Sequence, residues 1–199
     1  LGGLDAPLGG SARLMGVDLA TADESARQDI LRRSGFLFQG AALFSSLTLR
    51  ENIEMPMREF LRCPAKEMRQ LAEYKLALVG LADAMDKLPS EISGGMAKRA
   101  GIARAMALDP RVIFLDEPTS GLDVRTRHDV LHLLDELNQQ GLTIVLTTHD
   151  LNGIAAHLPK IVCLNTRIIG AGSPDEVLVP DVLERTYGSP MHILEHGGM

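Results

Sequence analysis

An apolar run that ends in two carboxylates constrains the fold of this chain more than any other feature. Val112-Ile113-Phe114-Leu115 is followed directly by Asp116 and Glu117. A strand made of consecutive apolar residues is typical of a parallel sheet that helices cover on its faces. The two carboxylates would then lie at the carboxyl edge of that sheet, where α/β proteins bind their ligands.

Short apolar runs alternate with helical patterns along much of the chain. Strand, helix, strand at this spacing predicts an α/β fold with a parallel sheet and crossover helices. Asn165-Thr166 separates the last two strands and predicts a hairpin. The expected strands are 36–38, 111–115, 142–148, 160–164 and 167–171, and the expected helices are 49–61, 64–79, 93–108 and 125–140, with short helices in 175–187.

No strand pattern occurs between residues 40 and 108, where helical patterns dominate. This stretch is therefore expected to be a helical subdomain inserted into an α/β core. We expect the core to comprise residues 1–39 and 109–172, and residues 173–199 to form a helical tail. The whole of 1–199 would be one domain with a lobe, which is large enough for a sizeable core.

Composition narrows the possible partners and compartment. The 199 residues carry a net charge of −6 and have a sequence pI near 5.5, which gives no support for nucleic-acid binding. No apolar run approaches the roughly 20 residues needed to cross a bilayer. Cys63 and Cys163 lack metal-ligand spacing and are interpreted as thiols in a reducing compartment. These features predict a cytosolic protein.

Three further marks carry possible chemistry. Ser93-Gly94-Gly95 opens a helix, and such a turn lets backbone N–H groups approach a phosphate. The simpler interpretation is a serine N-cap with glycines in a loop. Gln39 and His149 each follow an apolar strand, and a single residue of either type there is more often a turn or structural residue.

Together, Gln39, Ser93-Gly94-Gly95, Asp116-Glu117 and His149 resemble, in kind and order, the nucleotide-binding subunit of an ATP-binding cassette (ABC) transporter. The resemblance implies a P-loop NTPase-like parallel sheet with an inserted helical subdomain, which binds ATP and Mg²⁺. It implies a head-to-tail dimer, a homodimer, around two ATP sites.

The resemblance also implies a role for each marked residue. Glu117 would orient or deprotonate the attacking water, Asp116 and Gln39 would lie on the metal side, and His149 would contact the γ-phosphate. Ser93, Gly94 and Gly95 would contact the γ-phosphate of ATP held by the opposite subunit. Asp123 would lie at the dimer interface.

Further partners follow from the same resemblance. Transmembrane permease subunits would dock near Gln39 to Leu49, where Ala41–Phe44 and Leu47–Leu49 are largely apolar. Core packing is the alternative interpretation of those residues. An extracytoplasmic solute-binding protein would act indirectly, and the subunit would lie at the cytoplasmic face of the membrane.

Two departures from the family pattern stand out. Met96 occupies a position where the family most often has Gln, and the phosphate-binding motif GxxxxGK(S/T) does not occur. Residues 1–7 resemble the stretch just after the P-loop helix, so we expect the first strand and the P-loop, on the order of 30–40 residues, to be missing. The chain as printed is expected to bind ATP poorly and not to hydrolyse it.

The transported cargo is left open. Residues 38–44 and 92–99 resemble ATPases of phospholipid-trafficking importers linked to mammalian-cell-entry proteins. Residues 183–188 and 192–198 resemble zinc and manganese importers, which favours metal import slightly. Two other hypotheses are a truncated cassette that docks without hydrolysis and a soluble cassette ATPase in translation or DNA repair. Lys98, Arg99 and Arg104 are interpreted as a solvated basic helical face or as partners of a neighbouring carboxylate.

Overall fold

The computed structural model describes residues 7, 9–151 and 157–189. The predicted features in residues 1–6 and in the tail from 190 to 199 lie outside the described residues. The chain divides into two compact units, Leu1–His149 and Asp150–Met199. The finer division into core, inserted subdomain and tail stays a prediction.

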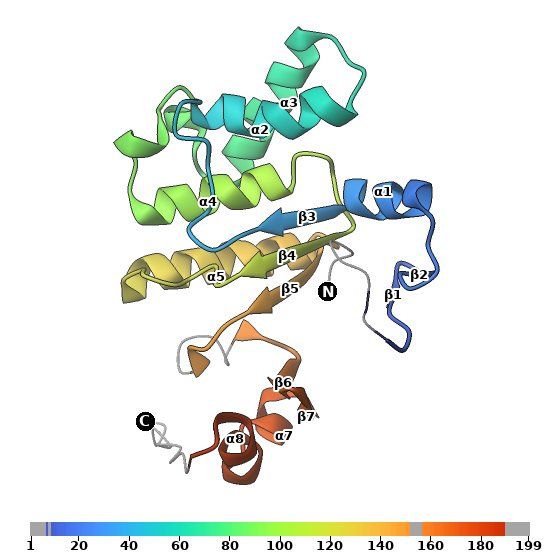
Figure 1. Cartoon of the computed structure of the whole chain (residues 1–199). Coiled ribbons are helices and arrows are strands. Elements are labelled where there is room, and N and C mark those ends of the chain that lie inside the picture. The colour runs from blue at the N-terminus through green and yellow to red at the C-terminus, as the bar shows by residue number, and fades with distance from the viewer. Residues whose placement is uncertain (1–6, 8, 152–156, 190–199) are drawn as a thin grey trace. The chain divides into compact units, whose positions relative to one another are not determined.

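A parallel three-stranded sheet lies at the centre of the first unit (Figure 1). Its strands are β3 (Ser34–Leu37), β4 (Val112–Asp116) and β5 (Thr143–Thr147), in the order β3-β4-β5. The register aligns Leu37 with Leu115, and Leu115 with Leu146. The predicted α/β fold with a parallel sheet is confirmed.

Two crossover helices connect these strands, α4 (Gly94–Ala105) and α5 (Val124–Gln139). Both crossovers step in the same direction across the sheet, so right-handed connections put both helices on one face. Accordingly, α4 contacts β3, α5 contacts β5, and the two helices contact each other. Gly35 allows the close approach of α4, because a Cβ there would lie 2.1 Å from the carbonyl oxygen of Ala105.

Helices form the segment between β3 and β4. They are α2 (Leu49–Phe60), α3 (Ala65–Leu78), η1 (Ala82–Ala84), η2 (Pro89–Glu91) and α4. Apolar side chains of α2, α3 and α4 share one core with the sheet. Among the described residues from 40 to 108 there is no strand, as the sequence predicted.

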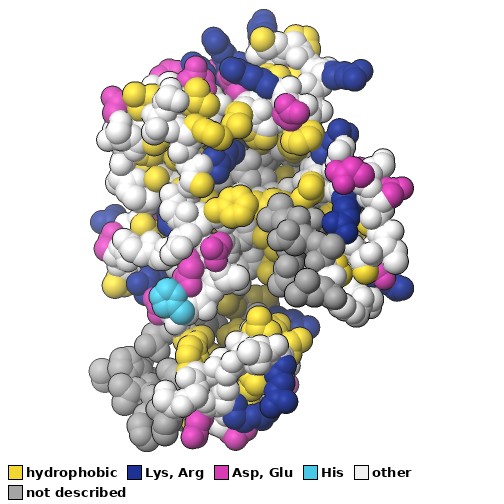
Figure 2. Space-filling model, in the orientation of Figure 1, with side chains coloured by type: hydrophobic (Ala, Val, Ile, Leu, Met, Phe, Trp, Pro, Cys, Tyr) yellow, Lys and Arg dark blue, Asp and Glu magenta, His cyan; other side chains and the backbone are white. Residues whose placement is uncertain are grey.

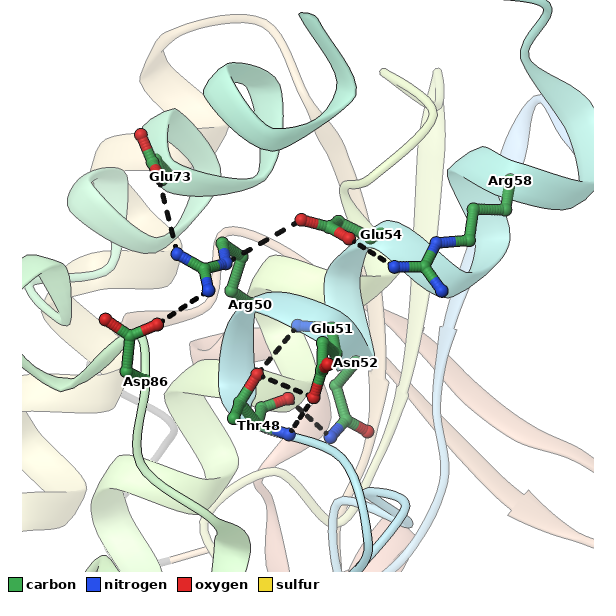
Figure 3. A network of polar contacts seen from close by, with 8 residues as sticks. All are labelled: Thr48, Arg50, Glu51, Asn52, Glu54, Arg58, Glu73 and Asp86. Atoms are coloured by element: carbon green, nitrogen blue, oxygen red, sulfur yellow. Dashed lines mark hydrogen bonds and ion pairs between the residues drawn. The ribbon is translucent and has the colours of Figure 1, made fainter. Parts of the chain in front are cut away.

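Polar contacts hold α2 in place (Figure 3). Thr48 and Glu51 form a reciprocal capping box at its start. Arg50 reaches Glu54 on the same helix at 3.7 Å, Glu73 on α3 at 3.6 Å and Asp86 at 2.7 Å. This single guanidinium therefore joins α2, α3 and the segment before η2.

Three elements near the start were not identified from the sequence. β1 (Arg13–Leu14) and β2 (Val17–Asp18) form a small antiparallel pair, and α1 (Glu24–Arg32) leads into β3. Asp23 caps α1 by accepting a hydrogen bond from the backbone N–H of Ala26.

The second unit contains a hairpin and two short helices. β6 (Ile161–Asn165) pairs antiparallel with β7 (Arg167–Gly172), and Thr166 between them has a φ of 54°. The predicted hairpin at Asn165-Thr166 is confirmed. α7 (Pro174–Val177) and α8 (Pro180–Tyr187) follow. In the part of the chain that the structure describes, none of the helices has the length and apolar character of a membrane-spanning segment.

Candidate functional site

Polar side chains gather where β4 and β5 end. Asp116 is paired in register with Thr147, and the Thr147 hydroxyl donates a hydrogen bond of 2.6 Å to Asp116 Oδ1. Just beyond, His149 Nδ1 lies 2.5 Å from Glu117 Oε1. The side chain of Glu117 is 17% exposed and that of His149 is 78% exposed. A sheltered carboxylate is thus paired with an imidazole that solvent can reach.

The backbone of Glu117 is fixed on both sides. Its φ of 49° lies in the left-handed region, which is uncommon for a residue with a side chain. Its N–H donates to the carbonyl oxygen of Thr147 at 3.2 Å. Its carbonyl oxygen accepts from Lys98 Nζ at 2.8 Å and from Ser120 Oγ at 3.0 Å. Strain of this kind occurs at functional sites, where the surroundings must hold it in place.

Register brings Gln39 to the same edge of the sheet. Leu37, the last paired residue of β3, aligns with Leu115, so Gln39 and Glu117 each lie two positions beyond an aligned pair. Gln39 is exposed, and the loop after it turns sharply, with positive φ at Gly40, Ala41 and Ala42. The structure therefore places Gln39 at the predicted edge by register.

Arg104 holds the loop after Gln39. Its guanidinium donates to the carbonyl oxygens of Ala42 at 2.7 Å and of Ala41 at 3.0 Å, and it lies 5.9 Å from the ring centroid of Phe44. Burial lowers the pKa of Arg104. Because Arg104 belongs to α4, this helix fixes the path of the chain beyond β3.

The serine turn opens α4 on the surface. Ser93 is the N-cap and accepts from the N–H of Met96 at 3.3 Å, and both Ser93 and Gly94 are exposed. Gly95 is buried, and a Cβ there would lie 2.2 Å from Cγ2 of Thr126 on α5. The second glycine is therefore required for packing between α4 and α5.

Asp123 caps α5 beside this turn. Its carboxylate accepts from the backbone N–H of Thr126 at 3.0 Å and from the Thr126 hydroxyl at 2.6 Å. These hydrogen bonds hold the pKa of Asp123 below its ordinary value, and the bond from the hydroxyl has the largest effect. Thr126 thus contacts both the Asp123 cap and the Gly95 turn, so the starts of the two helices are fixed together.

An apolar groove of about 880 Å³ lies along the outer edge of β3, between that strand and α2. Phe38, Phe44 and Phe60 are 43–50% exposed there. Figure 2 shows hydrophobic side chains gathered between the helical segment and the strands. Arg58, Glu59 and Arg104 add charge to the lining.

Two residues near the site escaped the sequence analysis. Thr147 was treated only as part of a strand, although its hydroxyl contacts Asp116. Lys98 was interpreted either as part of a solvated face or as a partner of a neighbouring carboxylate, and the first alternative is wrong because Lys98 is only 5% exposed. Burial lowers the pKa of the Lys98 ammonium, and the nearby carboxylates of Glu117 and Asp116 oppose that effect.

The side-chain oxygen atoms at this edge suit a hard cation that also binds water and phosphate. Asp116 offers carboxylate oxygens and Gln39 an amide oxygen, the ligand types that Mg²⁺ prefers beside water and phosphate. Among the described residues no group of three or more His, Cys, Asp or Glu could by itself hold a metal ion. A metal bound here would therefore depend on a phosphate ligand and on water.

Comparisons with known proteins give the same family. The family model described as ABC transporter matches residues 1–120. A methionine import ATP-binding protein of Burkholderia mallei is 38% identical over 96% of this chain and 46% of its own length. A probable ribonucleotide transport ATP-binding protein of Mycobacterium bovis is 44% identical over 79% of this chain and 44% of its own length. The chain thus spans less than half the length of these curated relatives.

Solved structures agree on the fold. The ATP-binding cassette MJ0796, determined as a dimer in a post-hydrolysis state with ADP and Pi, superposes with a TM-score of 0.77. It is 31% identical in sequence, and the match covers 87% of this chain and 77% of that one. Because the family model matches residues 1–120, more than half of the sequence, the chain belongs to the ABC transporter family.

Proposed function

We propose that this chain is the ATP-binding and ATP-hydrolysing part of an ABC importer. The observation that carries the proposal is the contact between Glu117 and His149, 2.5 Å apart beside Asp116 at the carboxyl edge of a parallel sheet. The curated relatives described above, named for methionine import and ribonucleotide transport, support a transport role.

In this proposal Glu117 acts as the general base. Its side chain is sheltered from solvent and its backbone is fixed, so the carboxylate is pre-positioned to orient a water and accept its proton. His149 is exposed on the other side of that carboxylate: with a proton on both ring nitrogens, Nδ1–H donates to Glu117 and Nε2–H can donate to a phosphate oxygen. A base that is already in place avoids reorganisation during the reaction.

Asp116 and Gln39 would hold Mg²⁺ together with the phosphates. When bound, the ion supplies charge neutralisation at the phosphate oxygens. The Thr147 hydroxyl donates to Asp116 Oδ1 and so restrains the carboxylate for this role. Hydrogen bonds of this kind, made to a residue that binds a metal, orient metal ligands in proteins.

A second copy of the chain would complete each site. Ser93, Gly94 and Gly95 lie at the start of α4, where backbone N–H groups and the helix dipole favour an anion. In the dimer this turn would contact the γ-phosphate held by the partner, and Asp123 would lie at the interface. The dimeric state of the related cassette MJ0796 supports this arrangement.

Permease subunits would dock in the groove beside β3. The groove combines exposed aromatic rings with Arg58, Glu59 and Arg104, which suits an amphipathic helix of a membrane partner. Docking would place the subunit at the cytoplasmic face of a membrane, with a solute-binding protein acting through the permease.

The cargo stays a prediction. The tail resemblance favours zinc or manganese, and the resemblance around Gln39 and Ser93 favours phospholipid. The two curated relatives are named for methionine and for ribonucleotide, and neither name mentions a metal. Cargo recognition belongs to the membrane and binding subunits, so this site does not distinguish these substrates.

Turnover of ATP by Glu117→Gln tests the proposal. In the chain joined to an upstream phosphate-binding loop, we expect this substitution to lower kcat by about a hundredfold or more. Calorimetry should show that ATP binding is retained, because the amide keeps the shape of the side chain. Glu136→Gln, on the exposed face of α5, is the matched control and should leave kcat unchanged. Full turnover by Glu117→Gln would exclude Glu117 as the base.

The 199 residues without an added loop provide a second comparison. They contain no GxxxxGK(S/T) motif, which supplies most backbone donors to the phosphates, so we expect weak ATP binding and little turnover from them. A docking module that never hydrolyses ATP is the alternative function. It predicts that the 199 residues bind a partner protein without turnover of ATP.

A further inference from the structure

Lys98 is a charged side chain almost completely buried beneath the carboxylates of the site. It lies on α4, in the second turn after the Ser93 cap, and is 5% exposed. Its ammonium donates to the carbonyl oxygen of Glu117 at 2.8 Å and to Ser120 Oγ at 3.3 Å. The lysine therefore reaches from one crossover helix to the turn that follows β4.

Burying an ammonium is unfavourable unless it is hydrogen-bonded and close to negative charge. Both conditions are met here, since desolvation lowers the pKa of Lys98 while Glu117 and Asp116 act in the opposite direction. A methionine would fill the same volume without that cost. Packing alone does not explain a lysine at this position, whereas a hydrogen bond to the Glu117 carbonyl does.

The bonded carbonyl belongs to a residue in an unfavourable conformation. Glu117 has a φ of 49°, and the Ser120 hydroxyl and N–H donate to the same oxygen at 3.0 and 3.2 Å. The two Ser120 donors come from within the turn, so they move with it. Lys98 is the donor from a separate, well-packed helix, and it anchors the turn to the body of the protein.

We propose that Lys98 is a positioning residue for Glu117: by holding the Glu117 carbonyl it fixes the backbone from which the carboxylate reaches His149. This inference rests on the proposed role of Glu117 as the base.

Hydrogen exchange and kinetics of matched variants test the proposal. Lys98→Met removes the donor and keeps the volume, and Lys98→Gln keeps an N–H donor without the charge. Arg99→Met is the control, because Arg99 is the next residue on α4 and donates to a backbone carbonyl, that of Val79, at 3.2 Å. All three variants are made in the chain joined to an added upstream phosphate-binding loop, and thermal unfolding confirms that each one folds.

We expect faster amide exchange at Ser120 in Lys98→Met, since that N–H bonds to the Glu117 carbonyl, and recovery in Lys98→Gln. We expect kcat to fall about tenfold in Lys98→Met while KM for ATP stays within about twofold, because a misplaced base affects the chemical step. Arg99→Met should change neither the exchange nor kcat.

Two results would overturn the proposal: unchanged Ser120 exchange in Lys98→Met, or unchanged kcat despite faster exchange. The exchange measurement needs no nucleotide. It therefore reports on the anchoring of the turn even if Glu117→Gln keeps full turnover and removes Glu117 as the base. Failure of the Lys98 proposal can thus be distinguished from failure of the proposal that Glu117 is the base.

Discussion

Glu117 is restrained through its backbone as much as through its side chain. Its N–H is bound to β5 through Thr147, its carbonyl to α4 through Lys98, and its carboxylate to His149. Two of these contacts come from β5 and the residues just after it, and the third comes from α4. A left-handed residue of this kind persists only where its surroundings determine its conformation.

Asp123 gives a pH-dependent stability that can be measured. Hydrogen bonds from Thr126 lower the pKa of this carboxylate below the ordinary value of 3.8. Its contribution is therefore present above about pH 3.8 and is lost as pH falls through the lower folded-state pKa. Asparagine can also cap a helix, but it does not titrate and brings no negative charge to the helix N-terminus. We expect the wild-type chain to be more stable than Asp123→Asn at neutral pH, and the difference to shrink in acid.

Urea unfolding at a series of pH values measures this difference. Thr126→Val is the companion variant, because it removes the hydroxyl that donates to Asp123 at 2.6 Å while keeping the shape of the side chain. It should reduce the pH dependence. A difference between Asp and Asn that is constant across the acid range would show that the cap bonds do not stabilise the ionised form.

The sequence placed some site residues and not others, for physical reasons. Asp116, Glu117 and His149 follow apolar strands, and ends of neighbouring parallel strands meet at one edge, so their proximity was predictable. The burial of Lys98 was not. Small and apolar residues lie on all sides of α4, which packs against β3, α2 and α5, so no polar stripe marks its solvent face. A lysine on such a helix gives no periodic signal of its environment.

At the scale of elements, Arg50 is the polar link within the helical segment. Glu54 is its most buried partner, with 9% of its side chain exposed, whereas Asp86 is 70% exposed and contributes less despite the shorter distance. Arg58 also contacts Glu54 and would remain after Arg50 is removed. We expect Arg50→Met to lower the free energy of unfolding by about 1–2 kcal/mol, less than a buried charge left alone would cost.

Chemical denaturation of Arg50→Met and Arg33→Met measures this effect. Arg33 forms an exposed pair with Asp29 at 3.4 Å, so its removal should change stability by no more than about 0.5 kcal/mol. Added salt should reduce the loss only slightly in Arg50→Met, since the Arg50 contact to Glu54 is shielded from solvent, whereas it should screen the exposed Arg33 pair. Equal effects of the two substitutions would mean that the network does not brace the helices.

Long elements were predictable and short ones were not. α2, α3 and α5 were expected within about two residues of their ends, as is usual for periodic segments bounded by caps or glycine. β3 begins at Ser34, two residues before the predicted start. The prediction missed these two residues because Ser34 and Gly35 carry no apolar side chain to mark a strand. The place of Gly35 in the sheet follows from its close packing on Ala105, a tertiary contact that local pattern cannot reveal.

At the scale of the whole molecule, the proposed ATP site is divided between two chains. Glu117 lies at the sheet edge, whereas Ser93 is exposed at the start of α4. If Ser93 serves the partner's site, a chain that lacks only Ser93 still offers an intact Glu117. A chain that lacks only Glu117 still offers an intact Ser93. Pairing the two defective chains then restores one complete site.

Mixing Ser93→Arg with Glu117→Gln tests this division, with each chain joined to an upstream phosphate-binding loop. Each variant alone should be inactive. Random pairing of equal amounts in a two-fold dimer should restore about a quarter of the wild-type rate, since half of the dimers carry one complete site of two. Mixing Ser93→Arg with a Ser93→Arg, Glu117→Gln double variant is the control and should restore nothing, because no intact serine remains. Absence of recovery in the first mixture, with dimers detected by light scattering, would place Ser93 and Glu117 in the same site of one chain.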